Sequence, residues 1–411
     1  MNKDSKRIQD NKKGSSFKGG VNIVISILLW LYHSVLRSIS AIILLIYLLS
    51  AFSDFFDPRS FLYLSFIGIA YHIILFVVLA WTLLLLILRH WKLALVMAIG
   101  LIITWEQITR YYPMNLFDNK PDVEALSIPG VDNEIHKIKL LTYNTCGMGQ
   151  VRLSSIKEQI PVIDLIREVD ADIVCLQEYA FTLSKGGHTQ ERIRKSLSDR
   201  YPYYDYMSNY SREAMGIALF SKYPIKKKER IDKSKKDYIS SMYYEIEVAG
   251  RNIALVNNHL HSNQIKPQDR VLYDEMIEHF DKDSLQRIRS GMLRSLGIGF
   301  KARANQSNVI RTYLSETING NDMPVLICGD MNDTPISYAY RKMRGNLLDA
   351  WQQGGFGAGT TYNQHHFWFR IDHIFHSSHF RTLDVKVLRQ YEYSDHYPVV
   401  ATFQLLPEAK Q

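Results

Sequence analysis

Polar side chains that could carry out hydrolysis stand at the ends of apolar, strand-like runs from residue 140 onward. The set contains four acids, two histidines and two amides: Asn144, Glu178, His259, Asp330, Asn332, Asp372, Asp395 and His396. If these strand ends meet at one edge of a sheet, the side chains form a single site. Their oxygen atoms suit Mg²⁺, a hard cation, far better than zinc. Together with histidines they suit in-line attack of water on a phosphate ester.

Each member of the set also has an ordinary structural explanation. An acid after an apolar run is commonly a turn former or a helix cap, and Asp372 beside His373 could be a surface pair. The joint occurrence of all eight residues in this order is what favours a catalytic site. The chain has no glycine-rich loop of the P-loop or dinucleotide type, so nucleotide-driven and hydride-transfer chemistry are not indicated.

The ordered motifs resemble the endonuclease/exonuclease/phosphatase superfamily, to which deoxyribonuclease-I-like enzymes belong. The likeness covers residues 136–406, and the chain is similar to membrane-anchored bacterial members of the Bacteroidota type. It rests on Asn144, Leu176-Gln-Glu178, residues 216–224, Asn258-His259-Leu260, Gly329-Asp330-Met-Asn332, Ile371-Asp372 and Ser394-Asp395-His396-Tyr-Pro398. The resemblance implies a four-layer α/β sandwich, with two mixed sheets packed between helices and the site at one edge.

The resemblance also implies a metal site. Glu178 would be the principal Mg²⁺ ligand, with Mn²⁺ as the expected substitute, and Asn144 beside it would contact the metal or the phosphate. Asp395 would support either the metal or His396. Cys146 stands where apurinic endonucleases of the family usually have an acid or amide, so abasic-site repair is disfavoured.

The remaining site residues would handle the phosphate and the water. The resemblance implies that His259 and Asn332 bind the scissile phosphate and stabilise its pentavalent transition state. Asp330 would orient or deprotonate water. Asp372 would bond His396, fixing its tautomer and raising its basicity. Whether Asp330 or the Asp372–His396 pair is the general base stays open at this stage.

Apolar, strand-like runs predict the strands that must position these side chains. They fall at residues 138–145, 172–179, 216–221, 238–248, 252–259, 325–328, 370–376 and 399–405. Helical periodicity is present at 156–169 and 302–318, and Gly250 indicates a hairpin turn. Residues 264–304 are long for a connection and predict either a substrate lid or a solvated helical hairpin. Cys146, Cys175 and Cys328 are interpreted as core residues without a redox or metal role.

The first 110 residues predict a membrane region. Residues 1–20 form a basic tail, and apolar runs at about 38–56, 61–88 and 91–108 predict three transmembrane helices, with 21–36 either extending the first or lying at the interface. A linker at 111–135 precedes the catalytic domain at 136–406. Because basic tails stay cytoplasmic, three spans predict a multi-pass protein of the bacterial inner membrane with the catalytic domain on the non-cytoplasmic side. If the third run does not span, that domain is cytoplasmic.

Charge and membrane context suggest three functions. The net charge is +8, but residues 111–411 hold only +2, so the basic balance does not by itself indicate nucleic-acid binding. The first hypothesis is a Mg²⁺-dependent phosphodiesterase acting near the lipid bilayer, on a lipid head group or similar ester. The second is an extracytoplasmic nuclease, supported by the run 226–230 with Lys233, Lys235 and Lys236. The third, a catalytically silent binding domain, is remote because every site residue is present. No obligate protein partner is inferred.

Overall fold

The computed structural model describes residues 3–115, 136–209, 212–231, 240–263, 282–318, 322–362, 364 and 368–407. The chain divides into two compact units. The first comprises Met1–Ser50 and Ala70–Thr104, and the second comprises Ala51–Ile69 and Trp105–Gln411.

The first unit is helical and strongly apolar. It contains α1 (Lys3–Ala51), α3 (Tyr71–Ile87) and α4 (Trp91–Ile103). The helices are joined by polar contacts inside the unit: the hydroxyls of Tyr47 and Thr104 lie 2.5 Å apart, and Trp81 donates to Ser40 over 3.0 Å.

One helical segment among the described residues, Val24–Ala51, is long and apolar enough to cross a membrane. Two further segments qualify only if each bent pair of helices counts as one span: Leu62–Ile69 with Tyr71–Ile87 bends by 62°, and Trp91–Ile103 with Trp105–Tyr111 bends by 64°. The expected bundle of three spans is therefore supported only in part. This candidate span begins at Val24 rather than near residue 38, because residues 21–36 continue α1 without a break.

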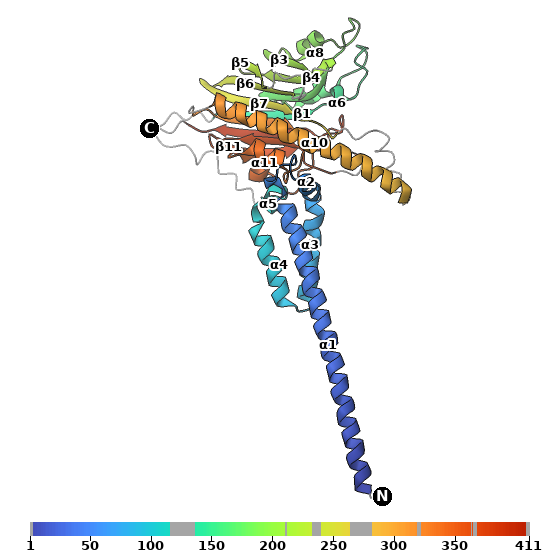
Figure 1. The fold of residues 1–411 in the computed structure, drawn as a ribbon. Helices are drawn as coiled ribbons and strands as arrows, with labels where there is room; N and C mark the ends of the chain where they lie inside the picture. The colour runs from blue at the N-terminus through green and yellow to red at the C-terminus, as the bar shows by residue number, and fades with distance from the viewer. Residues whose placement is uncertain are drawn as a thin grey trace. The chain divides into compact units, whose positions relative to one another are not determined.

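The second unit contains two six-stranded sheets, which confirm the expected fold (Figure 1). The first sheet has the order β11-β12-β1-β2-β4-β3: Phe380–Val387, Val399–Leu405, Lys137–Asn144, Ile173–Ala180, Arg212–Ser221 and Tyr203–Asn209. The second has the order β5-β6-β7-β8-β10-β9: Ile225–Arg230, Ser240–Val248, Arg251–His259, Val325–Asp330, Asp372–His376 and Leu348–Asp349. Both sheets are mixed, because β1 and β2 run parallel, as do β7 and β8.

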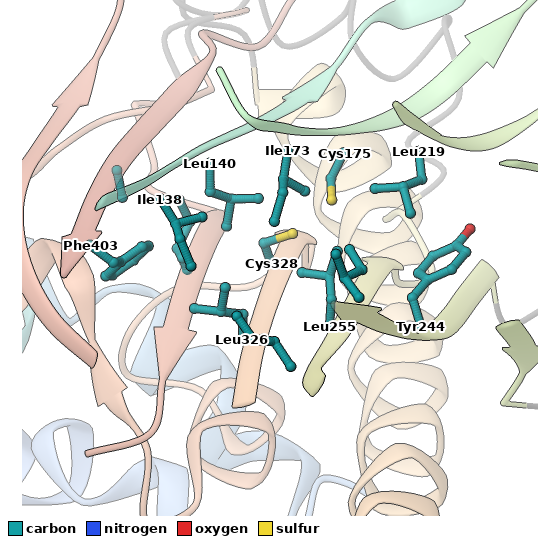
Figure 2. Packing of buried hydrophobic residues seen from close by; sticks show 14 of the residues in the cluster. Ile138, Leu140, Ile173, Cys175, Leu219, Tyr244, Leu255, Leu326, Cys328 and Phe403 are labelled. Atoms are coloured by element: carbon teal, nitrogen blue, oxygen red, sulfur yellow. The ribbon is translucent and has the colours of Figure 1, made fainter. Parts of the chain in front are cut away.

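The main core lies between the two sheets. Alternate residues of each strand point inward, so that Leu140, Ile173 and Cys175 of the first sheet meet Leu255 and Cys328 of the second (Figure 2). Cys175 and Cys328 are thus buried core residues as expected, whereas Cys146 is only half buried and belongs to the site described below.

Helices cover the outer faces of both sheets and complete four layers. On the first sheet, α7 (Pro161–Val169) and α8 (Gln190–Leu197) bury their apolar faces. On the second sheet, α10 (Lys282–Thr317) and α11 (Tyr338–Arg344) pack against β6, β7 and β8. The short helices α6 (Cys146–Gly149) and α12 (Ala350–Gly354) lie in connections.

Helix boundaries differ from the sequence pattern at two places. The first outer helix begins at Pro161 rather than at residue 156, because proline suits the first helical position and cannot continue a preceding turn. Residues 282–304 form one continuous helix with the following segment, so by themselves they are neither a loop lid nor a complete helical hairpin. Residues 264–281, which carried the rest of that expectation, lie outside the described residues.

Two segments next to the apolar helices belong to the second unit, and we call them together the collar: Ala51–Ile69 and Trp105–Asn115. The collar contains η1 (Ser53–Phe55), α2 (Leu62–Ile69) and α5 (Trp105–Tyr111). Its last residues are hydrogen bonded into the sandwich: Gly357 donates to the Pro113 carbonyl over 2.9 Å, and Asn115 donates to the Gly355 carbonyl over 2.8 Å. Residues 116–135 of the expected linker lie outside the described residues.

Gly329 sits where the second sheet leaves no room for a side chain. Its φ is +127°, and a Cβ there would lie 2.0 Å from the Asn258 carbonyl oxygen. We expect Gly329→Ala to lower the free energy of unfolding by about 3 kcal/mol, through backbone displacement beside the site. Gly250→Ala is the matched control, because φ there is +76° but nothing lies within 4 Å. The Gly250→Ala substitution should lower the free energy of unfolding by only about 1 kcal/mol. Equal losses of unfolding free energy in the two variants, measured by urea denaturation, would contradict the steric argument.

Candidate active site

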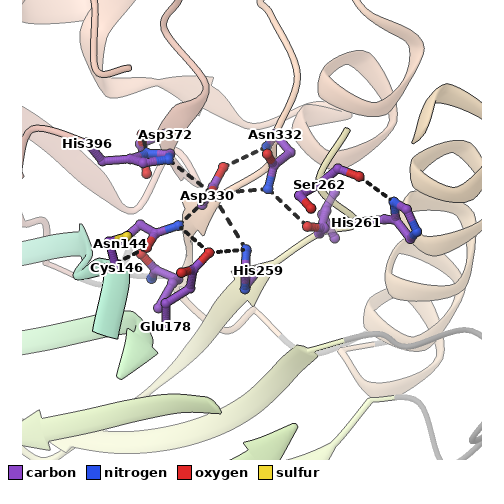
Figure 3. A network of polar contacts seen from close by, with 12 residues as sticks. Asn144, Cys146, Glu178, His259, His261, Ser262, Asp330, Asn332, Asp372 and His396 are labelled. Atoms are coloured by element: carbon purple, nitrogen blue, oxygen red, sulfur yellow. Dashed lines mark hydrogen bonds and ion pairs between the residues drawn. The ribbon is translucent and has the colours of Figure 1, made fainter. Parts of the chain in front are cut away.

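Three adjacent strands of the second sheet place their site residues in one row. In the sheet register, His259 at the end of β7 lies opposite Asp330 at the end of β8, and Asp330 lies opposite Asp372 at the start of β10. The row arises because β8 runs parallel to β7 and antiparallel to β10. Three residues far apart in sequence therefore meet at one sheet edge (Figure 3).

The first sheet contributes Asn144 and Glu178 to the same edge. Asn144 ends β1, while Glu178 lies at an irregularity of β2, where the register with β4 shifts between Leu176 and Tyr179. Glu178 has a left-handed φ of 48°. A bulge of this kind changes the direction of a side chain that regular pleating would send to the other face of the sheet.

The residue before Glu178 ties the two sheets together behind the site. Gln177 is fully buried, and its Nε2 donates to Asn257 Oδ1 of β7 over 2.7 Å. Asn257 in turn donates to the Ala218 carbonyl over 3.1 Å. Sequence reasoning did not identify this pair, although Gln177 lies within the Leu176-Gln-Glu178 motif and Asn257 directly precedes Asn258.

The connection after Asn144 is a left-handed turn. All five residues from Cys146 to Gln150 have positive φ, and only two of them are glycines. The turn is held from within: Asn144 Oδ1 accepts the Cys146 N–H over 3.1 Å, and Thr145 Oγ1 accepts the Met148 N–H over 3.2 Å. Such strained backbone persists where surrounding contacts fix it, often at functional sites.

Asp330 is the centre of the hydrogen-bond network. Its Oδ2 accepts Nδ2 of Asn144 and Nδ2 of Asn332, each over 3.0 Å, and its Oδ1 accepts the Asn332 N–H over 2.7 Å. Asn144 Nδ2 also lies 3.4 Å from Glu178 Oε1. Because the oxygen of Asn144 binds the Cys146 N–H, Asn144 positions the two carboxylates and does not turn its oxygen toward them.

His259 faces the gap between the two carboxylates. Its Nε2 lies 3.6 Å from Glu178 Oε1 and 3.7 Å from Asp330 Oδ2. This buried nitrogen has no hydrogen-bond partner among the described residues. A buried polar atom without a partner is costly, so the position is suited to a ligand that carries its own oxygen atoms.

Asp372 and His396 form a buried pair on the other side of Asp330. His396 Nδ1 lies 2.8 Å from Asp372 Oδ2, and His396 Nε2 lies 3.7 Å from Asp330 Oδ2. Burial alone would lower the pKa of His396, but attraction to Asp372 and Asp330 outweighs it and raises that pKa to about 10. The same attraction holds the pKa of Asp372 below its usual value against burial. Burial raises the pKa of Asp330 to about 6, against the opposing charge of His396.

Asp395 and Cys146 lie at the margin of the network. Asp395 Oδ1 accepts Ser394 Oγ over 3.2 Å, and its charge adds to those of Asp372 and Asp330 in raising the pKa of His396. Burial, followed by the charges of Asp395 and Glu178, raises the pKa of the Cys146 thiol to about 12. The thiol is therefore protonated at neutral pH.

The donor set fits a divalent cation near Glu178. Asp330, Asp372 and His396 lie close enough to share an ion, since their ligand atoms are within 4.8 Å of one another. A protonated imidazole, however, has no lone pair for a metal. Glu178 is the most accessible of the clustered acids, with 31% of its side chain exposed against 1% for Asp330. We therefore assign Glu178 as the carboxylate that would hold a metal.

The comparisons with known proteins agree with this geometry. The model of the Endonuclease/Exonuclease/phosphatase family matches residues 141–396, which contain all eight site residues. The chain belongs to this family. Its members hydrolyse phosphate esters with the help of divalent metals, and the protein is accordingly a phosphoric ester hydrolase. A second model, described as a domain of unknown function, matches residues 33–111. Among curated proteins, none matches the chain.

Solved structures resemble the chain at low sequence identity. The catalytic domain of human nocturnin is 17% identical, with 65% of this chain and 93% of that chain covered and a TM-score of 0.46. The mannosyl-6-phosphatase of Bacteroides thetaiotaomicron is 17% identical, with 65% of this chain and 99% of that chain covered and a TM-score of 0.43. A family member from Bacteroides vulgatus is 16% identical, with 66% of this chain and 99% of that chain covered and a TM-score of 0.44.

Further residues support this family site without belonging to its motifs. Arg303 of α10 is fully buried and donates from Nε to Asp333 Oδ2 over 3.0 Å, next to Asn332. Its Nη1 donates to the His261 carbonyl over 2.9 Å, two residues after His259. Sequence analysis identified neither Arg303 nor Asp333. The signal it missed is an arginine on a helical face that otherwise packs into the core.

Asp372→Asn should release His396 from its protonated state. Removing the carboxylate charge removes the largest influence that raises the pKa of His396, so we expect that pKa to fall from about 10 toward its ordinary value of about 6.5. Histidine-selective ¹³C NMR titration measures this directly.

The same pairing makes stability depend on pH. Because the folded pKa of His396 lies above the unfolded value of about 6.5, the pair stabilises the fold fully below that pH, and the contribution is lost as the pH rises through about 10. An unchanged His396 titration in Asp372→Asn would show that the pairing does not control the imidazole.

Proposed function

We propose that the protein is a membrane-anchored, Mg²⁺-dependent phosphodiesterase that acts on phosphodiesters at or near the bilayer. The observation that carries this proposal is the convergence of Glu178 and Asp330 on the unpartnered Nε2 of His259. Carboxylates on one side and an imidazole nitrogen on the other suit a phosphate ester and its cation together. The apolar helix Val24–Ala51 supports attachment to a membrane.

Each side chain has a role that follows from its contacts. Mg²⁺, held by Glu178, would polarise a phosphoryl oxygen and offset its charge. His259 Nε2, when it carries the proton, is placed to donate to a phosphoryl oxygen. Both amide hydrogens of Asn332 are already used, on Asp330 Oδ2 and on the Leu260 carbonyl at 3.1 Å. Asn332 therefore acts chiefly by fixing Asp330.

The protonation states favour Asp330 as the general base. With a pKa of about 6, Asp330 is ionised at neutral pH yet basic enough to accept a proton from water. His396, with a pKa of about 10, is protonated at that pH and supplies positive charge beside Asp330. Asp372 then serves to keep His396 in that state.

The lysine run that suggested a nuclease is largely neutralised in the described part of the chain. Lys226 pairs with Glu247 over 2.7 Å, and Lys227 pairs with Glu245 over 3.7 Å. Lys228 pairs with Asp205. Lysines held by neighbouring acids offer less positive charge to a polyanion, which favours a lipid or other small phosphodiester over nucleic acid. Lys233, Lys235 and Lys236 lie outside the described residues.

Purified full-length protein in detergent should hydrolyse a phosphodiester in Mg²⁺ and lose this activity on chelation. We expect Glu178→Gln to lower kcat by on the order of 10²–10³, because the amide cannot replace the carboxylate charge. The assay compares phosphocholine release from lipid vesicles with nicking of plasmid DNA. Lipid hydrolysis without nicking supports the proposal, and nicking alone would establish the nuclease instead.

The matched control for this experiment is Glu247→Gln. Glu247 is an exposed acid paired with Lys226 on the second sheet, and its substitution should leave turnover unchanged. Hydrolysis of neither substrate by the folded wild-type protein would reject the proposed phosphodiesterase.

We further propose a multi-pass topology with three crossings, whose apolar helices in the first unit are α1, α3 and α4. Three crossings with a cytoplasmic basic tail place the catalytic domain on the non-cytoplasmic side of the bacterial inner membrane. Alkaline phosphatase fused after Gln411 should then be active, whereas green fluorescent protein at the same position should not fluoresce. The reverse pattern would mean that the number of crossings is even and that the domain is cytoplasmic.

A further inference from the structure

The collar is joined to the sandwich by charged side chains that are almost completely buried. Arg110 Nη1 lies 2.8 Å from Asp54 Oδ2, and the two side chains are 3% and 0% exposed. Asp54 comes from the segment after α1, and Arg110 comes from α5, so the pair closes the two halves of the collar on each other. Arg110 also contacts the face of the Tyr340 ring of α11, with its guanidinium carbon 5.7 Å from the ring centre.

The collar contacts the loop that follows Asp330. Arg110 Nη1 donates to the Pro335 carbonyl over 3.5 Å, and Ser53 Oγ donates to the Ile336 carbonyl over 3.3 Å. These two carbonyls lie three and four residues after Asn332, which holds both oxygens of Asp330. The earlier part of the loop is fixed at Asp333 by Arg303. The loop is therefore held from α10 on one side and from the collar on the other.

A second contact runs from the collar to the strand that carries Asp372. Arg370 Nη2 donates to the Arg110 carbonyl over 2.6 Å, and its Nη1 donates to Asp349 Oδ2 over 2.8 Å. Arg370 is 2% exposed and stands two residues before Asp372. The α5 backbone thus fixes the start of β10, where Asp372 meets His396.

We infer that Asp54 and Arg110 are positioning residues of the active site, and that the collar holds in place the segments that carry Asp330 and Asp372. The inference rests on the proposed function, since it concerns the same site. A buried ion pair adds little net stability compared with apolar residues of similar volume. Here the ion pair fixes an orientation. Asp54 holds the Arg110 guanidinium so that it points toward the Pro335 carbonyl in the loop that follows Asp330, which we call the catalytic loop.

The expected kinetic consequence is specific. Asp330 acts on the water and Asn332 fixes Asp330. His259 reaches the site from β7, which the collar does not contact through these hydrogen bonds. Loosening the loop should therefore lower kcat and leave KM nearly unchanged. A purely structural role would instead lower the amount of folded protein without changing the turnover of the folded fraction.

The test uses the full chain in detergent micelles with the double substitution Asp54→Leu and Arg110→Met. It removes both charges together and keeps similar volumes, so neither charge is left buried alone. We expect kcat to fall at least about tenfold with KM within about twofold, at an unchanged melting temperature. The matched control is Asp199→Leu with Arg167→Met, a surface pair at 2.6 Å on the opposite outer layer, which should keep wild-type kinetics.

Two further measurements keep the test decisive. If the double variant does not fold, Ser53→Ala removes only the hydrogen bond to Ile336 and should lower kcat by about threefold, the loss of one ordinary hydrogen bond.

Histidine-selective ¹³C NMR needs no turnover: the double variant in the collar should shift the His396 signal, and the control pair should not. If the wild type proves inactive on phosphodiesters, the proposed function fails while this spectrum still tests the collar. Wild-type kcat and an unshifted His396 signal in the folded double variant would overturn the inference.

Discussion

A carboxylate that is fully buried must be surrounded by donors, and Asp330 imposes this requirement on the whole site. Asn144 comes to it from the first sheet, Asn332 from its own loop, and the charge of His396 from the loop before β12. Each of these groups must lie within hydrogen-bonding or ion-pairing reach, so the two sheets, the β8–α11 loop and the β11–β12 connection have to be in register with one another. The site depends on several independent elements at once, because all of them contribute to satisfying one buried charge.

This requirement explains why the convergence of these residues could be predicted from the sequence. Polar residues at the ends of apolar runs are costly unless they converge, so their repeated occurrence predicts convergence without any knowledge of the fold. The strands that carry them were also predictable, because β1, β2, β7 and β8 are buried on both faces and read as apolar runs.

Edge elements and supporting contacts could not be predicted in the same way. β5 reads Ile-Lys-Lys-Lys-Glu-Arg and forms a strand only because β6 offers it a partner, and β3 is an edge strand dominated by tyrosine and polar residues. The roles of Asp54, Arg110 and Arg303 depend on contacts between residues tens to hundreds of positions apart. Local periodicity contains no information about such pairs. The apparent surface pair Asp372 and His373 is likewise buried, because β10 lies inside the second sheet.

The interrupted course of the second unit along the chain has a consequence for biosynthesis. Asp54 is made 56 residues before the arginine that neutralises it, and Ser53 is made 283 residues before the carbonyl that accepts its hydrogen bond. At the roughly 5–20 residues per second of translation, the first wait lasts several seconds and the second on the order of half a minute. During that time the first half of the collar has to persist next to a newly made apolar helix with a carboxylate that has no counter-ion. The contacts between the collar and the catalytic loop can therefore form only late in synthesis, long after Ser53 and Asp54 have been made.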